Sequence, residues 1–155
     1  MLSDKRIGRK LVWLLNIICT LIAFFSIITA YLASIGSPLT GYLYLLFKPT
    51  CHQLAQRSIF LWGHQMPVCA RCAGVWFSLM IFGYIATIIL YIKTFRPLSL
   101  KLFLISLLPL ALDGLSQLTG LRESTNTIRL ITGAIVGISI IWFTYPRLWI
   151  VDSGK

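Results

Sequence analysis

Charged residues are scarce in this sequence, and acidic residues are the scarcest of all. Only 12% of the 155 residues are charged, and four are Asp or Glu, whereas about a quarter of the residues in a typical soluble domain are charged. This composition excludes an ordinary soluble domain. The sequence also lacks internal repeats, a P-loop, a nucleophile elbow and a His-Glu-x-x-His motif, so no common catalytic signature assigns an enzyme class.

Long apolar runs take the place of the missing charges. Hydrophobic residues make up 57% of the chain, the mean hydropathy is +0.84, and runs approaching 20 residues are long enough to cross a bilayer core. We expect an all-α, polytopic membrane bundle that forms one domain over residues 1–155, with spans near residues 11–35, 67–92, 98–118 and 126–145. The shorter apolar segment 39–47 predicts an interfacial or re-entrant helix.

The basic residues predict a topology. The 14 Lys and Arg residues give a net charge of +10, but they gather at the ends of apolar runs and form no aromatic-interleaved patch, so nucleic acid is not an expected partner. With four spans both termini share one side, which holds nine of the 14 basic residues, and the other side holds five. This bias predicts a plasma-membrane protein with both termini in the cytoplasm and the lipid bilayer as its partner.

Three of the four cysteines fall on the predicted outer side. Cys69 and Cys72 form a CxxC pair at the expected start of a helix, and Cys51 precedes them. With one histidine, either His52 or His64, they supply the four ligands of a tetrahedral zinc site, and Cu(I) accepts the same soft ligands. The CxxC pair also suits redox chemistry, because a helix N-terminus and a neighbouring arginine lower thiol pKa values. Structural disulfides on an oxidising outer side are the third interpretation.

A buried acidic residue marks a second cluster. Asp113 lies in an otherwise apolar span near its outer end, where an ionisable residue is a functional candidate. Arg129, early in the next span, lies at a matched depth of ~6–8 Å, so we expect an Asp113–Arg129 ion pair. Gly133 and Gly137 would let the helices approach closely. The ordinary alternative is that this pair only holds two helices together.

Further charged residues lie along the same rim. The turn between the third and fourth spans carries Arg122 and Glu123, although Glu123 also suits the dipole of the following helix. The candidate catalytic residues are Asp113, Glu123, Arg122 and Arg129, with either acidic residue as general base. The candidate anion-binding residues are Arg57 and Arg71.

Two ordered signatures stand out along the chain. The first comprises Cys51-His52-Gln53, Arg57-Ser58, Gly63 and Pro67-Val68-Cys69-Ala70-Arg71-Cys72-Ala73-Gly74. The second comprises Asp113-Gly114, Gln117, Gly120-Leu121-Arg122-Glu123-Ser124, Asn126, Arg129 and Thr132-Gly133. Together, over roughly residues 45–140, they resemble a domain-of-unknown-function family of small prokaryotic membrane proteins. The resemblance brings no activity with it. It implies that the cysteines, Asp113, Arg122 and Arg129 share one site, and it favours His52 over His64.

Three classes of function fit these residues. In the first, an outer-face metal beside the arginines acts on a lipid or other anionic head group by hydrolysis or transfer. In the second, Cys69 and Cys72 form the active pair of a membrane thiol–disulfide oxidoreductase, with Cys51 as a third partner. In the third, zinc or a disulfide staples a small transporter or a non-catalytic subunit of another membrane protein. Metal that survives reducing agent would distinguish the first class from the second.

Overall fold

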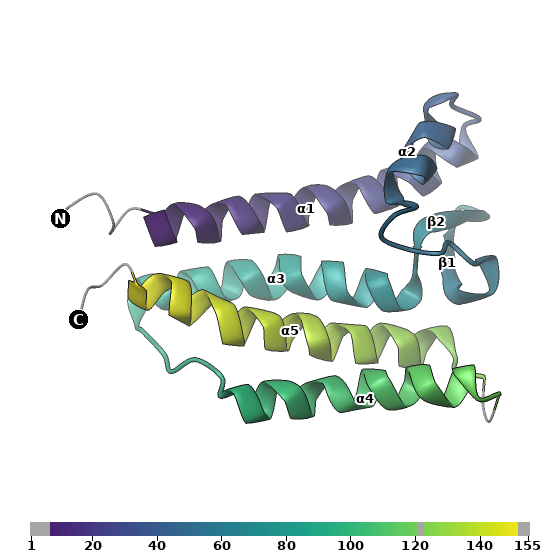
Figure 1. Cartoon of the computed structure of the whole chain (residues 1–155). Helices are drawn as coiled ribbons and strands as arrows, with labels where there is room; N and C mark the ends of the chain where they lie inside the picture. Colours follow the sequence, from purple (N-terminus) through teal and green to yellow (C-terminus); the bar gives the residue numbers. More distant parts are fainter. Residues whose placement is uncertain (1–6, 121–122, 152–155) are drawn as a thin grey trace.

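Four long helices dominate the computed structural model, which describes residues 7–120 and 123–151 (Figure 1). They are α1 (Ile7–Ser34), α3 (Ala70–Ile92), α4 (Leu100–Leu118) and α5 (Asn126–Val151). All four are long and apolar enough to cross a membrane, so the expected all-α membrane bundle is confirmed. The start of α1 and the end of α5 lie at the same end of the bundle.

The short elements gather at the opposite end of the bundle (Figure 1). They are α2 (Leu39–Phe47), η2 (Ala55–Arg57), β1 (Ser58–Leu61) and β2 (His64–Cys69). The two strands pair antiparallel, and the residues between them, Trp62 and Gly63, have φ values of 51° and 75°. Positive φ at both positions of a two-residue loop suits a hairpin. The short α2 matches the helix expected at this place.

The hairpin corrects the expected start of the second span. The sequence indicated a loop up to residue 66 and a helix from residue 67, but Pro67 and Val68 belong to β2. The strand continues because Cys69 pairs with Ser58 of β1, and α3 begins only at Ala70. The CxxC pair still lies at a helix start, as expected.

Small residues bring α3 and α5 into close contact. A Cβ atom on Gly133 would overlap the backbone carbonyl of Arg71, and one on Gly137 would overlap the hydroxyl of Ser78. On the facing helix, a Cβ on Gly74 would overlap the carbonyl of Leu130. The close approach predicted from Gly133 and Gly137 is therefore present, but the helix they face is α3 and not the sequence neighbour α4.

Helix α5 lies at the centre of the bundle and packs against α1, α3 and α4. Buried polar contacts fix α1 to α3 and to α5. The Asn16 amide donates to the Thr87 hydroxyl at 2.9 Å and accepts from the Tyr145 hydroxyl at 2.7 Å. Gly83 leaves room for this amide, because a Cβ there would overlap it. Interhelical hydrogen bonds of this kind contribute about 0.6–2 kcal/mol each in a membrane.

The last helix is longer than the sequence indicated. Pro146 and Arg147 were expected to end it, but α5 continues to Val151. Because Pro146 has no N–H, the Trp142 carbonyl has no helical donor, and it accepts a hydrogen bond from the Leu98 N–H at 3.0 Å. Arg147 donates in turn to the Leu98 carbonyl at 2.9 Å. The connection between α3 and α4 is thereby bound to α5, which explains why the helix tolerates the proline.

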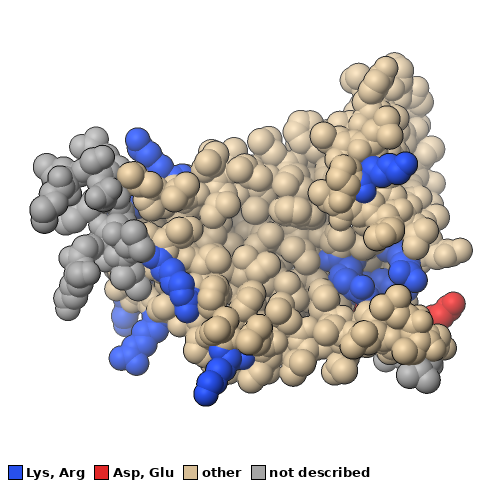
Figure 2. Space-filling model, viewed as in Figure 1, with Lys and Arg blue, Asp and Glu red and all other residues tan. Residues whose placement is uncertain are grey.

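Charged side chains lie at the two ends of the molecule. Figure 2 shows Lys and Arg atoms at both ends, with an uncharged surface between them in that view. Such a distribution is typical of a protein whose middle is surrounded by hydrocarbon.

Candidate functional site

Three cysteines from separate segments meet at the hairpin end of the bundle. Cys51 follows α2, Cys69 ends β2 and Cys72 lies in the first turn of α3. Their sulfur atoms lie within 4.8 Å of one another, and all of them are free thiols. Zinc–sulfur bonds of about 2.3 Å in a tetrahedral site hold sulfur atoms ~3.8 Å apart. A metal ion between these sulfurs therefore requires only small side-chain movements.

The hairpin and the helix start position the sulfur atoms. Cys69 is the N-cap of α3, and its sulfur accepts a hydrogen bond from the Cys72 N–H at 3.5 Å. The Cys69 N–H donates to the Cys51 sulfur at 3.1 Å. Backbone donors and the positive end of a helix dipole both favour thiolates. Because the thiolate is the form that binds metal, the local backbone favours metal binding.

The Cys51 thiol has a lowered pKa. Side-chain hydrogen bonds with Cys69 and then with Cys72 are the main cause, and backbone hydrogen bonds from Gln53 and Cys69 act in the same direction. Burial opposes them and is outweighed. Hydrogen bonds to the charged form favour that form, so the environment of Cys51 favours its thiolate.

Neither histidine joins the three sulfurs. Both His52 and His64 are exposed, and among residues 7–120 and 123–151 the close group contains only the three cysteines. His64 begins β2 at the hairpin turn. His52 follows Cys51 directly and lines the pocket that contains the cysteines. His52 thus stays the predicted fourth ligand, and it needs a rotation toward the sulfurs to act as one.

The cysteines open into a pocket of about 370 Å³. Its other lining residues include three arginines, Arg57, Arg71 and Arg129, together with Leu118 at the end of α4. In Figure 2, Lys and Arg atoms lie in a hollow at this end of the molecule. Thiolates and guanidinium groups in one pocket can hold a cation at the sulfurs and an anion beside it.

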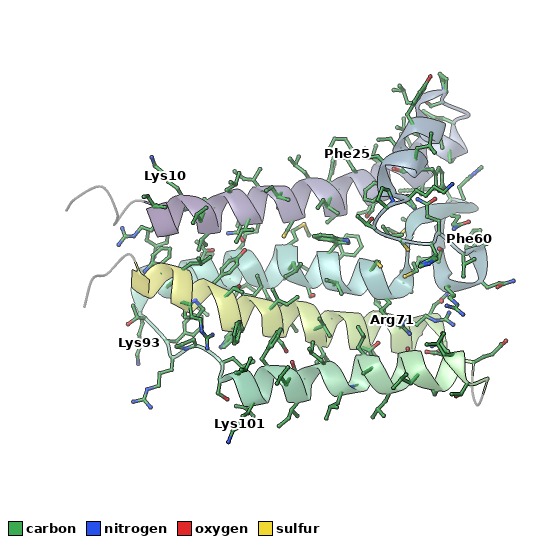
Figure 3. The ribbon with its side chains drawn as sticks, viewed as in Figure 1. Lys10, Phe25, Phe60, Arg71, Lys93 and Lys101 are labelled. Carbon is green, nitrogen blue, oxygen red and sulfur yellow. The ribbon has the colours of Figure 1, made fainter. Side chains whose placement is uncertain are left out.

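Arg71 provides the main contact between this pocket and α4. Figure 3 shows its side chain near the start of α3. It forms an ion pair with Asp113 of α4, which also accepts hydrogen bonds from Gln117 at 3.1 Å and from Ser124. The expected ion pair between Asp113 and Arg129 is therefore wrong. The expected depths of Asp113 and Arg129 did not indicate that a side chain of α3 also reaches the Asp113 carboxylate.

Arg129 is held by neutral groups instead. Its guanidinium donates to the side-chain oxygens of Asn126 at 2.8 Å and Gln117 at 3.2 Å, and to the Gln56 carbonyl at 3.4 Å. Only 7% of the residue is exposed. Gln117 therefore links Asp113 to Arg129 indirectly, so the two charged residues share one hydrogen-bond network.

A second pocket of about 490 Å³ adjoins the first. Both share Arg57 and Arg129, and the second is also lined by Gln56, Gln117, Gly120, Glu123 and Ser124. Glu123 thus reaches the predicted site, whereas Arg122 lies outside the described residues. Gln56 and Ser124 were not predicted to belong to the site. Their positions directly beside Arg57 and Glu123 are the signal that would have indicated them.

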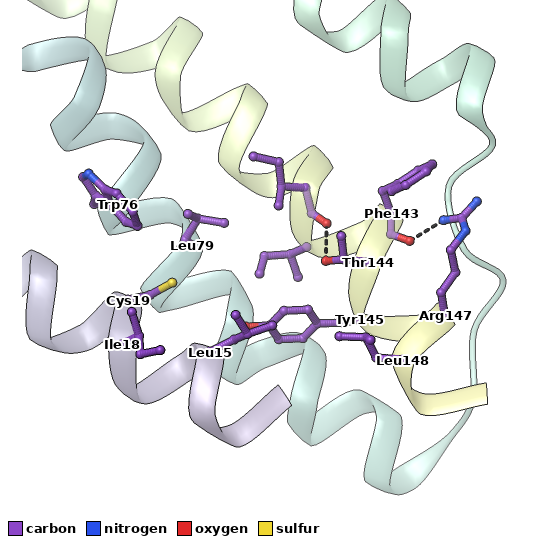
Figure 4. Close-up of a pocket in the computed structure, with 12 residues that line it drawn as sticks. Leu15, Ile18, Cys19, Trp76, Leu79, Phe143, Thr144, Tyr145, Arg147 and Leu148 are labelled. Carbon is purple, nitrogen blue, oxygen red and sulfur yellow. Dashed lines mark hydrogen bonds between the residues drawn. The ribbon is translucent and has the colours of Figure 1, made fainter. Parts of the chain in front are cut away.

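A third cavity lies away from the three-cysteine cluster. It has about 560 Å³ and is lined mainly by apolar side chains of α1, α3 and α5 (Figure 4). Cys19 lies here beside Trp76 and Leu79, which agrees with a role as a small apolar side chain. Arg147 at the edge donates to the Phe143 carbonyl within α5. The described residues that line this cavity include no group of metal ligands.

Comparisons with known proteins give the same picture as the fold. The family described as "Predicted membrane protein (DUF2085)" matches residues 51–143, a range that begins at Cys51. An uncharacterized protein of Methanocaldococcus jannaschii is 37% identical over 144 residues, which cover 88% of this chain and 92% of the relative. Another, from Methanothermobacter thermautotrophicus, is 35% identical over 98 residues, covering 63% of this chain and 86% of its own. No solved structure matches.

Proposed function

Because this chain belongs to the DUF2085 family of membrane proteins, we propose that it is an integral membrane protein that binds zinc at its outer face and an anionic head group beside the metal. The observation that carries the proposal is the group of three thiol sulfurs within 4.8 Å of one another. They share a pocket with Arg57, Arg71 and Arg129.

The ligand chemistry supports zinc. Thiolates are soft ligands that suit zinc and Cu(I) far better than calcium or magnesium. Three protein ligands with a fourth position open to a pocket are typical of a catalytic zinc site, and a fourth protein ligand is typical of a structural one. The position of His52 decides between these two types of site. If His52 binds the zinc, the site is closed; if His52 is displaced, the fourth position is open to water or substrate.

The arginines support an anionic ligand. Arg129 interacts electrostatically with Arg57 and Arg71, so three cations lie close together with one ion-paired carboxylate, that of Asp113. Guanidinium groups bind phosphate and carboxylate through paired N–H donors. Near a membrane surface, a lipid head group offers such an anion. Zinc would supply a Lewis acid to polarise an ester or phosphoryl oxygen at this place.

The acidic residues then take different roles in hydrolysis or transfer. Asp113 is buried and already bound by Arg71 and Gln117, so it positions the arginine. Glu123 is exposed and lines the adjoining pocket, so it is the better candidate for a general base.

The backbone around the CxxC pair also favours a second function, that of a thiol–disulfide oxidoreductase. The Cys72 N–H bonds to the Cys69 sulfur at the helix start, a geometry that activates a thiol for exchange. In that reaction the Cys69 thiolate attacks a partner's disulfide, forms a mixed disulfide and releases the partner's first thiol. Cys72 then attacks the Cys69 sulfur, so that a Cys69–Cys72 disulfide forms and the partner's second thiol leaves; the two electrons lost by the cysteine pair reduce the partner. Cys51 would be the third thiol of the site.

Metal analysis of the purified protein tests the proposal. Wild type purified without chelator is expected to contain about one zinc per chain that survives reducing agent. Cys72→Ser should abolish binding, His52→Ala should weaken it at least ten-fold, and His64→Ala should leave it within two-fold. Cys19→Ser is the matched control, since Cys19 lies outside the cluster. A metal-free wild type with three freely reacting thiols would refute the metal centre, and a reversible Cys69–Cys72 disulfide would favour the oxidoreductase.

A further inference from the structure

Two arginines form the wall between the cysteine pocket and its neighbour. Arg57 and Arg129 line both cavities, of about 370 and 490 Å³. The second cavity contains no cysteine among its described lining residues, so the metal proposal does not explain it. An anion held by the two guanidinium groups would lie where the two cavities meet, and the rest of the ligand would extend into the second.

Arg129 lacks an ionic partner in the described part of the chain. It is 7% exposed, its guanidinium donates to two amide oxygens and one carbonyl, and its Nε is buried without a hydrogen bond in residues 7–120 and 123–151. The Asp113 carboxylate, which interacts with it electrostatically, is ion-paired with Arg71. Burial of a guanidinium is unfavourable unless a counter-charge accompanies it. A bound anion would provide that counter-charge.

The wall of the second cavity is suited to hydroxyl groups. Gln56 and Gln117 carry amides that donate and accept, Ser124 carries a hydroxyl, and Glu123 carries a carboxylate acceptor. Apart from Gly120, the remaining described residues of its lining are the two arginines. A carboxylate beside two cations would repel a second anionic group but accept hydrogen bonds from alcohols. The cavity therefore fits a neutral, hydroxylated portion attached to an anion.

We propose that Arg57 and Arg129 bind the phosphate of a polyol phosphate ester, and that Gln56, Gln117 and Glu123 bind its hydroxyl groups. A phosphate offers enough oxygens to engage both guanidinium groups and the Arg129 Nε at once. The inference names the ligand of the anion-binding half of the proposed function, on which it rests, and it is independent of the metal.

The ligand has two possible sources with the same chemistry. The cavity lies at the ends of α4 and α5, at the rim of the apolar part of the bundle. A glycerophospholipid head group and a free polyol phosphate both reach this rim. Only the lipid carries apolar chains. The affinities of a lipid probe and of the free polyol phosphate therefore distinguish the two sources.

Calorimetric binding to metal-stripped protein in detergent tests the inference. The probes are glycerol 1-phosphate, inorganic phosphate, glycerol and short-chain phosphatidylglycerol. We expect saturable binding of glycerol 1-phosphate, weaker binding of phosphate and none of glycerol. Arg57→Gln should weaken both phosphate probes at least ten-fold. Glu123→Gln should weaken glycerol 1-phosphate several-fold and leave inorganic phosphate within two-fold.

A matched control distinguishes a general effect of net charge from the loss of a specific contact in the site. Lys48→Gln removes an exposed cation at the end of α2 that lines neither cavity, and it should change no affinity by more than two-fold. Tighter binding of phosphatidylglycerol than of glycerol 1-phosphate identifies a lipid source, and the reverse order a soluble one. No saturable binding by wild type, or equal effects of Arg57→Gln and Lys48→Gln, would overturn the inference. Zinc content of the untreated protein, measured in parallel, reports on the metal centre alone.

Discussion

Arg71 in the first turn of α3 forms an ion pair with Asp113 of α4, beside the three cysteines. Gln117 extends this contact, because its amide donates to Asp113 at 3.1 Å and accepts from Arg129 at 3.2 Å. Polar groups of three helices are thus joined at one end of the bundle. The effect of removing one charged member therefore depends on which others remain.

The first prediction concerns the ion pair. Asp113→Asn is expected to lower the free energy of unfolding in detergent, because Arg71 loses its carboxylate. Breaking a fully buried pair costs about 3–5 kcal/mol. The Arg71 side chain is 24% exposed, so we expect the lower value of about 1–3 kcal/mol. Adding Arg71→Gln should recover part of the loss.

The two substitutions Asp113→Asn and Arg71→Gln form a double-mutant cycle. Its control is the cycle of Asp113→Asn with Arg129→Gln. Gln117 links these two residues, whereas Asp113 and Arg71 form a direct ion pair, so the losses of Asp113 and Arg129 should come closer to adding than those of Asp113 and Arg71. Thermal or denaturant unfolding of the four variants measures both couplings. An equal or larger coupling to Arg129 would contradict the assignment of Arg71 as the direct partner.

The second prediction concerns protons at the metal centre. The pKa of Cys51 is lower in the fold than in an unfolded chain, where it is about 8.5. The thiolate therefore contributes stability above the unfolded value, and this contribution is lost as pH falls through the folded value. Zinc binding at pH 7 should accordingly release fewer than three protons for three cysteines.

Calorimetry in buffers of different ionisation enthalpy counts these protons. Zinc affinity should fall as pH drops, because Cys69 and Cys72 must still lose protons to bind. Cys51→Ser should leave the proton count nearly unchanged while it weakens binding, since the lost ligand was already ionised. Release of three protons by wild type at pH 7 would show that Cys51 is a thiol in the metal-free protein.

The third prediction concerns orientation. Nine of the 14 basic residues lie on the side of the termini, so both termini are predicted to be cytoplasmic. Single cysteines replacing Ser3 and Thr50, in a chain without native thiols, distinguish the two sides of the membrane. A membrane-impermeant maleimide added to intact cells should label position 50 only. Labelling of position 3 alone would invert the topology and place the metal site in the cytoplasm.

The fourth prediction concerns the contact between α3 and α5. Gly133→Ala places a methyl group against the Arg71 carbonyl, and overpacking of this kind costs about 1–3 kcal/mol. It should lower the melting temperature and, because the Arg71 backbone moves, the zinc affinity as well. Gly41→Ala in α2 is the control, since a Cβ there meets no atom within 4 Å. Equal melting temperatures for both variants would contradict the tight contact.

Hydropathy predicted the four long helices and the short α2, because a bilayer core imposes length and apolarity on each span directly. The hairpin was not predicted, since β1 and β2 have only four and six residues and no Asn-Gly or Asp-Gly turn. Trp62-Gly63 adopts the positive φ values of such a turn all the same. Short strands are specified by pairing between segments, which a single-sequence pattern reports weakly.

The candidate site was predicted in composition and only partly in arrangement. The grouping of Cys51, Cys69 and Cys72 agrees with the expected metal ligands. The partner of Asp113 was wrong, because residue depth along a helix follows from sequence but helix order and rotation do not. Arg71 bridges the sequence-adjacent helices α3 and α4 through its ion pair with Asp113. The face of α5 that carries Gly133 packs against α3.

The exposure of α4 has a consequence for membrane insertion during synthesis. Asp113 is the only buried residue of this helix, and α4 has the lowest hydropathy of the four spans, 1.4. It leaves the ribosome before α5, the helix against which it packs. An aspartate at the centre of an inserting helix costs about 2.5–3.5 kcal/mol, and the cost is smaller near the end of the helix, where Asp113 lies. Arg71, synthesised earlier, is already present to neutralise it, so α4 can enter the bilayer before the rest of its binding surface exists.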